Sequence, residues 1–305
     1  MYPQSGWRLS NTREVGLGKN KRKKARLYLS KIGFFTLIIY REFPLERVSQ
    51  VCIKMYPSGR IYVIFTVEEP ETQEQTLDEP AKVVGVDLGI ERLATLSDGR
   101  YLENPKPLER SLERIRLLQR RLSRKKFLSG NWFKSKRRLA KEYEHVKNLR
   151  RDLFFKLGVL LAQEYDLLVL EDLDVQGLIQ RGVTRTRRMR LHDSSFSELR
   201  RCMEWVFQKR GKTVLAVSAY NTSRECFLCG GINKGLTLGD RVFVCPECGW
   251  TVDRDYNASL VLLRRAGWVP PAVPAVDHWG HKRNTEDDRE ATDWLCRTSF
   301  DQNQR

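Results

Sequence analysis

The chain has 305 residues, long enough to bury a sizeable core in roughly one to three domains. It carries 55 lysines and arginines against 38 aspartates and glutamates, a net charge of +17. Such an excess is typical of proteins that bind an extended anion, either nucleic acid or an anionic membrane. No apolar run approaches the roughly eighteen residues that span a bilayer, so we exclude a membrane and expect nucleic acid as the partner.

The N-terminal quarter of the chain predicts a basic arm followed by a small β-rich domain. Residues 1–24 are polar and basic and predict a mobile arm. Residues 25–69 predict the β-rich domain, because β-branched and aromatic runs alternate there with turn residues. Its strands are expected at Phe34–Ile39, Val51–Met55 and Ile61–Val67. Residues 68–80 are acidic and polar, with Pro70 and Pro80 near the ends, and predict a linker.

Residues 107–162 predict an antiparallel pair of helices, since apolar residues recur at helical spacing on both sides of a turn at Ser129-Gly130-Asn131. From Arg110 to Arg151 there are sixteen lysines or arginines and three glutamates, whereas a merely solvated face normally mixes its charges. This hairpin is therefore expected to contact phosphates, with ring stacking on bases at its tip, and a solvated face is the alternative. The expected nucleic-acid-binding residues are Arg120, Arg121, Arg124, Lys125, Lys126, Trp132, Lys136 and Arg137.

Three acids in the remaining α/β sequence are candidate metal ligands. Asp87 and Glu171 each end a wholly apolar strand, the position where α/β proteins build active sites, and Asp255 begins a short helix. A buried carboxylate is costly unless it is paired or binds a cation, and hard oxygen ligands suit Mg²⁺. Singly, each acid could instead cap a helix or form an ion pair. Together, in a basic chain, they favour a nuclease in which two Mg²⁺ ions activate water and stabilise the leaving oxygen.

Two cysteine pairs predict a structural zinc site. Cys226-x-x-Cys229 and Cys245-x-x-Cys248 have the spacing of a four-thiolate site with no open position. The alternatives are disulfides or buried thiols, but disulfides suit small secreted domains and no signal peptide is evident. The other cysteines are isolated, which favours a reducing, cytosolic compartment. Residues 266–305 contain prolines and little periodicity, and predict a disordered tail.

Over about residues 25–265 the sequence resembles the TnpB family, the OrfB proteins of bacterial insertion sequences, which are related to the nucleases of type V CRISPR systems. Four ordered motifs carry the resemblance: Val84-Gly-Val-Asp87-Leu-Gly-Ile with Ser97-Asp98-Gly99, Leu170-Glu171-Asp172-Leu173, Asn221-Thr222-Ser223-x-x-Cys226-x-x-Cys229-Gly230, and Asp253-Arg-Asp255-x-Asn257-Ala258. The family implies an RNase H-like (RuvC) nuclease domain, here over residues 81–265, preceded by a β-rich wedge domain. The helical hairpin (107–162) and a zinc ribbon (222–252) are insertions in that domain.

The resemblance also implies roles. Asp87 and Glu171 match the first and second catalytic acids, and Asp255, two places before Asn257, matches the third in preference to Asp253. The four paired cysteines match the ribbon ligands. Family members are RNA-guided DNA endonucleases, many labelled transposases. The expected cofactors are therefore catalytic Mg²⁺ and structural Zn²⁺, and the expected partners are DNA and an RNA guide, near the nucleoid in the cytoplasm of a prokaryotic cell.

One departure keeps a second function open. Family members have a helical recognition lobe and a first wedge strand before the segment that begins here near Gly6, and this sequence lacks that portion. The alternative is thus a truncated or non-cleaving member that binds RNA or DNA. A Holliday-junction resolvase would share the nuclease fold, but the zinc ribbon before Asp255 argues against it. The sequence leaves the oligomeric state open.

Overall fold

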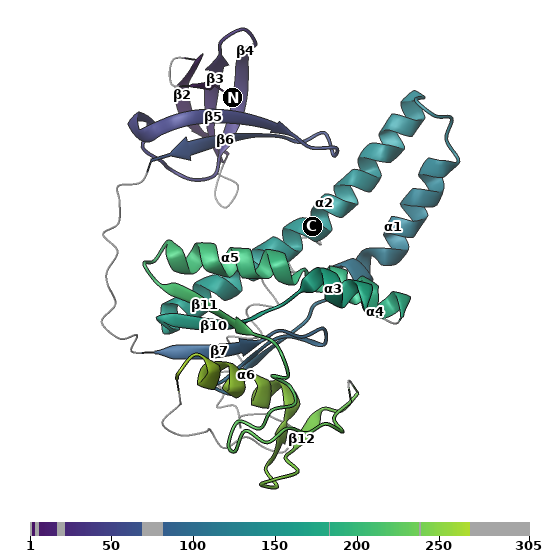
Figure 1. Cartoon of the computed structure of the whole chain (residues 1–305). Coiled ribbons are helices and arrows are strands. Elements are labelled where there is room, and N and C mark those ends of the chain that lie inside the picture. The colour runs from purple at the N-terminus through teal and green to yellow at the C-terminus, as the bar shows by residue number, and fades with distance from the viewer. Residues whose placement is uncertain are drawn as a thin grey trace. The chain divides into compact units, whose positions relative to one another are not determined.

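The structure, a computed structural model, describes residues 2–3, 6–16, 22–68, 82–182, 184–237 and 239–268 (Figure 1). The chain divides into two compact units, Met1–Glu74 with Leu118–Lys141, and Gln75–Leu117 with Glu142–Arg305. The expected linker lies almost wholly outside the described residues, as does the expected tail from residue 269 onward. None of the described helices is long and apolar enough to cross a membrane.

The first unit contains two three-stranded antiparallel sheets. One has the order β2-β3-β4 and the other the order β1-β5-β6. The strands are β1 (Tyr2–Pro3), β2 (Trp7–Val15), β3 (Arg22–Leu29), β4 (Gly33–Ile39), β5 (Val48–Met55) and β6 (Ile61–Val67), with a 3₁₀ turn η3 (Leu45–Arg47) before β5. Their alternating side chains meet in a core around Leu27, Leu29, Val48 and Val51, as expected of sheets with one buried face.

The prediction of a mobile N-terminal arm was wrong. Trp7–Val15 is strand β2, paired antiparallel with β3, and the pairs Trp7↔Leu29 and Leu9↔Leu27 set its register. Trp7 and Leu9 pack against the core and Arg8 between them is exposed, the alternation of a half-buried strand. The basic composition concealed this pattern.

The second unit is built on a five-stranded sheet of order β11-β10-β7-β8-β9. Its strands are β7 (Val83–Asp87), β8 (Arg92–Leu96), β9 (Tyr101–Glu103), β10 (Leu167–Asp172) and β11 (Thr213–Ser218). The three strands β7, β10 and β11 are parallel, and β8 and β9 continue the sheet antiparallel. A first strand in the centre, an antiparallel meander on one side and parallel strands on the other define the RNase H-like arrangement, which confirms the expected α/β fold class.

Helices cover both faces of this sheet (Figure 1). The α-helices of the described residues are α1 (Pro107–Ser123), α2 (Gly130–Glu164), α3 (Val175–Gln180), α4 (Arg185–Ser194), α5 (Phe196–Gln208) and α6 (Arg254–Arg265). On one face Val84 and Leu168 belong to a core with residues of α2 and α5. On the other face Val169 packs against Leu262 and Leu263 of α6. Burial on both faces explains why these strands read as continuous apolar runs.

The helical hairpin α1–α2 has the expected extent, but its turn comes earlier than the sequence suggested. Ser129 precedes the first residue of α2, and its hydroxyl accepts a hydrogen bond from the backbone N–H of Trp132 at 3.2 Å. This bond satisfies one of the free amides of the helix start. The turn therefore occupies residues 124–129, and its last residue, Ser129, caps the second helix.

Candidate functional site

Strand register brings the first two candidate acids together. Leu170 of β10 pairs with Val86 of β7 in parallel, so the next residues, Glu171 and Asp87, stand at the same level on adjacent strands. Residues at one level of a parallel pair point to the same face of the sheet. Both are only 7% exposed. The buried ends of two parallel strands thus present two carboxylates side by side.

A glycine brings the third acid to this edge. A Cβ built on Gly85 would lie 2.2 Å from the backbone oxygen of Ser259, so α6 crosses β7 in direct backbone contact. Asp87 lies two residues beyond Gly85 on the same face, and Asp255 lies one helical turn before Ser259. The N-terminus of α6 consequently approaches the ends of β7 and β10. Gly85 belongs to the first motif, but no pattern in the sequence predicts its contact with Ser259.

The electrostatics of the edge agree with this geometry. Burial raises the pKa of Asp87 well above its ordinary value, and the negative charges of Glu171 and Asp255 raise it further. Burial also raises the pKa of Glu171, against the effect of Thr222, whose hydroxyl donates to Glu171 Oε1 at 2.5 Å. Two buried carboxyl groups with raised pKa values, beside the charge of Asp255, favour a bound cation. Thr222 was part of a sequence motif but had no assigned role.

The two aspartates at the start of α6 have different surroundings. Asp253 caps the helix, because its Oδ1 accepts from the backbone N–H groups of Asp255 and Tyr256 at 3.0 Å, and its Oδ2 accepts from Arg92 at 2.9 Å. Asp255 faces two arginines: Arg254 Nη2 lies 2.9 Å from its Oδ1, and Arg241 Nη1 lies 3.5 Å from its Oδ2. Both oxygens of Asp253 are thus committed to structure.

The four cysteines predicted as zinc ligands come together. Their Sγ atoms all lie within 4.8 Å of one another, with Cys226–Cys248 at 3.7 Å and Cys229–Cys245 at 3.4 Å. Zn–S bonds of about 2.3 Å in a tetrahedron require an edge of about 3.8 Å, so the set fits zinc. The backbone N–H of Cys248, which donates to Cys245 Sγ at 3.5 Å, holds the pKa of that thiol down to about 7. Among the described residues, these four cysteines are the one group of three or more potential ligands that lie close enough together to share a metal ion. The three acids lie at one edge of the sheet but are farther apart than the four sulfur atoms.

The short ribbon strands β12 (Val242–Val244) and β13 (Thr251–Asp253) connect the second cysteine pair to α6. Phe243, Val252 and Tyr256 are buried with Cys226 and Cys245 in a core that joins the ribbon to the helix. The ribbon is therefore packed on the helix that carries Asp255.

The expected nucleic-acid-binding residues lie around the tip of the hairpin α1–α2. The seven predicted cations are exposed, whereas Trp132 is half-buried. Trp132 packs edge-on against Phe127 at 5.0 Å and Phe133 at 5.1 Å, and Lys136 Nζ lies 4.8 Å from its ring centre. Phe127 and Phe133 are 70% and 51% exposed, so they are the rings most available for stacking. Phe127 was not among the predicted residues.

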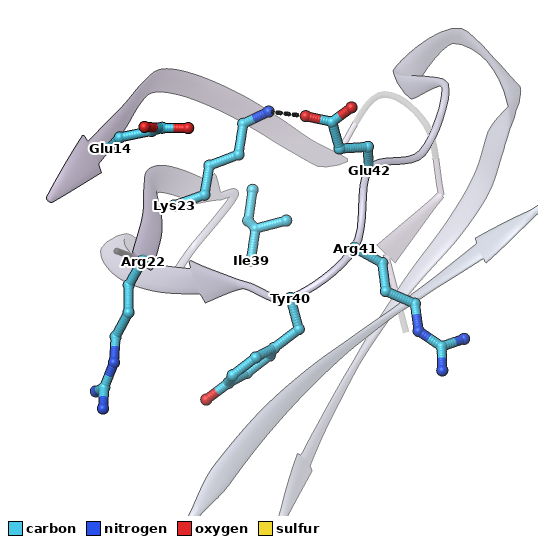
Figure 2. Close-up of a pocket in the computed structure, with 7 residues that line it drawn as sticks. All are labelled: Glu14, Arg22, Lys23, Ile39, Tyr40, Arg41 and Glu42. Carbon is cyan, nitrogen blue, oxygen red and sulfur yellow. Dashed lines mark hydrogen bonds and ion pairs between the residues drawn. The ribbon is translucent and has the colours of Figure 1, made fainter. Parts of the chain in front are cut away.

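A separate pocket lies on the sheet of β2, β3 and β4 (Figure 2). Its volume is about 220 Å³, and it is lined by Glu14, Arg22, Lys23, Ile39, Tyr40, Arg41 and Glu42. Lys23 donates to Glu42 at 2.6 Å, and this bond lowers the pKa of Glu42. Figure 2 shows the guanidinium groups of Arg22 and Arg41 directed away from that pair. The acids of this pocket do not converge as those at the sheet edge do.

Comparisons with known proteins agree with the motifs. Residues 63–182 match the family model OrfB_IS605, described as "Probable transposase", and residues 196–262 match the Cas12f1-like TNB domain. Over 261 residues the chain is 31% identical to the Escherichia coli K12 protein named "Putative RNA-guided DNA endonuclease InsQ", covering 80% of this chain and 63% of that protein. Over 207 residues it is 31% identical to a Streptomyces pristinaespiralis protein of the same designation, covering 68% of this chain and 50% of that protein.

Two further matches involve CRISPR proteins. The CRISPR-associated DNA-binding protein Cas12m of Allomeiothermus silvanus is 32% identical over 159 residues, 48% of this chain and 29% of that protein. A cryo-EM structure of a Cas12f1–sgRNA–target DNA complex aligns with a TM-score of 0.44 at 15% identity, over 84% of this chain and 66% of that chain. The chain belongs to the TnpB family. It spans 63% of the length of the Escherichia coli relative and 50% of that of the Streptomyces pristinaespiralis relative.

Proposed function

We propose that the chain is a metal-dependent DNA endonuclease of a mobile element that acts with an RNA guide. The observation that carries the proposal is the convergence of Asp87, Glu171 and Asp255 on one buried edge of an RNase H-like sheet. The relatives named as RNA-guided DNA endonucleases support the same activity and suggest the guide.

The three carboxylates would hold two Mg²⁺ ions, since hard oxygen donors suit this ion. When bound, Mg²⁺ supplies an activated water and charge stabilisation for the leaving oxygen of a phosphodiester. The chain's own contribution is to orient the ligands: the Thr222 hydroxyl fixes one oxygen of Glu171, and Asp253 caps the helix that carries Asp255. Asp255 is the better candidate for the third acid, because its charge acts on both Asp87 and Glu171, whereas Asp253 caps the helix and pairs with Arg92.

The other two predicted sites would serve binding and folding. The exposed cations at the hairpin tip would contact phosphates of DNA or of the RNA guide, and the adjacent rings would stack on bases. The four-thiolate site would hold a structural Zn²⁺, since a closed site leaves no position for a substrate.

The test is cleavage of supercoiled plasmid with Mg²⁺ by protein co-purified with its flanking genomic RNA, which is also sequenced to identify the guide. Alanine at Asp87, Glu171 or Asp255 should abolish cleavage and leave nucleic-acid binding largely intact, because phosphate contacts come from other surfaces. If Asp255→Ala cuts normally and Asp253→Ala does not, the third acid is Asp253.

A second candidate function is binding without cleavage. The similarity to a protein named as a CRISPR-associated DNA-binding protein favours it. Retained RNA and DNA binding with no Mg²⁺-dependent cutting by the unaltered chain would select this alternative.

A further inference from the structure

The first cysteine pair is attached to helix α6 through a buried asparagine. Asn257 is 0% exposed, its Oδ1 accepts from the backbone N–H of Phe227 at 3.1 Å, and its Nδ2 donates to the backbone oxygen of Glu225 at 2.7 Å. A donor partner on one side and an acceptor on the other define the orientation of the amide. Both polar ends of Asn257 therefore grip the loop that begins the zinc ribbon.

One arginine ties the same loop to α6 two turns further along the helix. Arg264 Nη1 donates to the backbone oxygens of Cys226 at 3.1 Å and Phe227 at 2.6 Å, and Arg264 also forms an ion pair with Glu225. These bonds pair the Phe227 carbonyl, which is costly to leave unpaired where it is buried, and add a second donor to the Cys226 carbonyl. The first cysteine pair is thus held along the length of α6.

The second cysteine pair is attached to α6 by the chain itself. Strand β13 leads from Cys248 to Asp253, the cap of the helix, and Val242 pairs with Asp253 across the ribbon. The backbone N–H of Arg254 donates to the backbone oxygen of Arg241 at 2.8 Å. Asp255 consequently lies between two attachments to the ribbon, one before it at Asp253 and one after it at Asn257.

Asp255 and Asn257 lie on opposite sides of the helix. Residues two apart on an α-helix point about 200° away from each other, so Asn257 faces the ribbon when Asp255 faces the sheet edge. The two hydrogen bonds of Asn257 to the loop fix the rotation of the first turn of α6, and with it the direction of the Asp255 carboxylate. The clustering of the four sulfur atoms brings the two cysteine pairs, and so the two attachments, together.

We propose that Asn257 is a positioning residue that couples the folded zinc ribbon to the metal-binding carboxylate Asp255. This inference rests on the proposed role of Asp255 as a metal ligand. Groups that orient a ligand without touching the metal typically change metal affinity or activity by about 10–100-fold when removed. We expect a loss of this size for Mg²⁺ at the sheet edge in Asn257→Ala, with the zinc retained, because the four cysteines are unchanged.

The matched control is Asn233→Ala. Asn233 also uses both ends of its amide in the ribbon, accepting from the backbone N–H of Gly235 at 3.0 Å and donating to the backbone oxygen of Val244 at 2.9 Å. It makes these bonds inside the ribbon and none of them reaches α6. The two variants thus remove comparable ribbon contacts, and only Asn257→Ala releases the helix.

The experiment compares the full-length chain and both variants in three measurements. Zinc content is measured by elemental analysis, hydrogen exchange by mass spectrometry over the segment that contains Phe227, and Mn²⁺ affinity by electron paramagnetic resonance. Mn²⁺ is the probe because it prefers the same oxygen ligands as Mg²⁺ and its binding is seen without cleavage. Asn257→Ala should keep about one zinc, exchange faster at Phe227 and bind Mn²⁺ about 10–100-fold more weakly, while Asn233→Ala keeps the unaltered Mn²⁺ affinity.

Unaltered Mn²⁺ affinity in Asn257→Ala would overturn the inference, and so would an equal loss in Asn233→Ala, which would indicate general damage to the ribbon. If Asn257→Ala does not fold, Asn257→Asp carries the test, because it keeps the shape and the acceptor for Phe227 but loses the donor to Glu225. Normal Mn²⁺ affinity in that variant would equally refute the coupling. An unaltered chain that binds Mn²⁺ but never cuts DNA would refute the proposed endonuclease and leave the inference intact.

Discussion

Replacing Asp87 by asparagine should stabilise the metal-free protein. Burial, followed by the charges of Glu171 and Asp255, raises the pKa of Asp87, so the folded state binds the proton more tightly than the unfolded state does. The stability that this carboxyl contributes is therefore present below the ordinary aspartate pKa of about 3.9 and is lost as the pH rises through the raised pKa. Near neutral pH the buried charge opposes folding, and asparagine removes that charge without changing the shape.

The size of the gain can be bounded. Asp87 is 7% exposed and has two acids as neighbours, and substitutions that relieve such a site commonly add about 0.5–2 kcal/mol. For a domain of this size about 1 kcal/mol shifts the midpoint of thermal unfolding by roughly 2–4 °C. Saturating Mg²⁺ should reverse the order, because a ligand at 100 times its Kd stabilises the unaltered chain by about 2.7 kcal/mol and asparagine removes one ligand.

The assay is thermal unfolding in buffer without added divalent cations or chelator, and then with excess Mg²⁺, at about pH 4 and near neutral pH, with the zinc content measured in each sample. The gain of Asp87→Asn should appear near neutral pH and shrink toward pH 4, and with excess Mg²⁺ the unaltered chain should become the more stable of the two. The control is Asp98→Asn: Asp98 accepts from Arg100 at 2.7 Å and Tyr165 at 2.6 Å, so its loss should destabilise by roughly 1.5–3 kcal/mol. Equal destabilisation by both variants would show that Asp87 is a paired structural acid.

Three further outcomes are expected. Cys245→Ser should lose both the zinc, measured by elemental analysis, and plasmid cleavage, while millimolar Mg²⁺ leaves the zinc of the unaltered chain in place because thiolates are soft ligands. Neutralising four hairpin cations should reduce the slope of log K against log salt on duplex DNA by up to about 0.9 per lost phosphate contact, and an unchanged slope would indicate a solvated face; the four are Arg120, Arg121, Arg124 and Lys125. Gly85→Ala should destabilise by roughly 1–3 kcal/mol and impair cleavage, because its Cβ would meet Ser259, whereas Gly130→Ala, with open space around it, should leave both unchanged.

The sequence signals that point to the candidate site are local. Asp87 and Glu171 each end an apolar strand, and the two cysteine pairs have the spacing of metal ligands. Each of these candidates can be recognised from a few neighbouring residues. The pairing of β7 with β10 and the clustering of the four Sγ atoms then follow from the fold that such segments form.

The rest of the site depends on partners distant in sequence. Gly85 reveals its role only against Ser259, 174 residues later, and Asn257 only against the loop of Phe227. The strand at Trp7–Val15 was mispredicted for the same reason: its few apolar side chains form a buried face only when β3 pairs with it. Pattern within a window could not show these contacts.

The position of the zinc ribbon in the chain has a physical consequence for the acids. The ends of β7 and β10 fix Asp87 and Glu171 through sheet hydrogen bonds, but Asp255 stands on a helix whose first turn has no strand to hold it. Repulsion among the three carboxylates would push that turn away from the edge. Three sets of contacts oppose this displacement: the helix cap by Asp253, the two arginines beside Asp255, and the hydrogen bonds of Asn257. All three belong to the ribbon or to its junction with α6. Arg92 of the sheet adds an ion pair with Asp253. Zinc bound by the four thiolates immediately before Asp255 would therefore supply folding energy at the part of the sheet edge where the carboxylates repel one another.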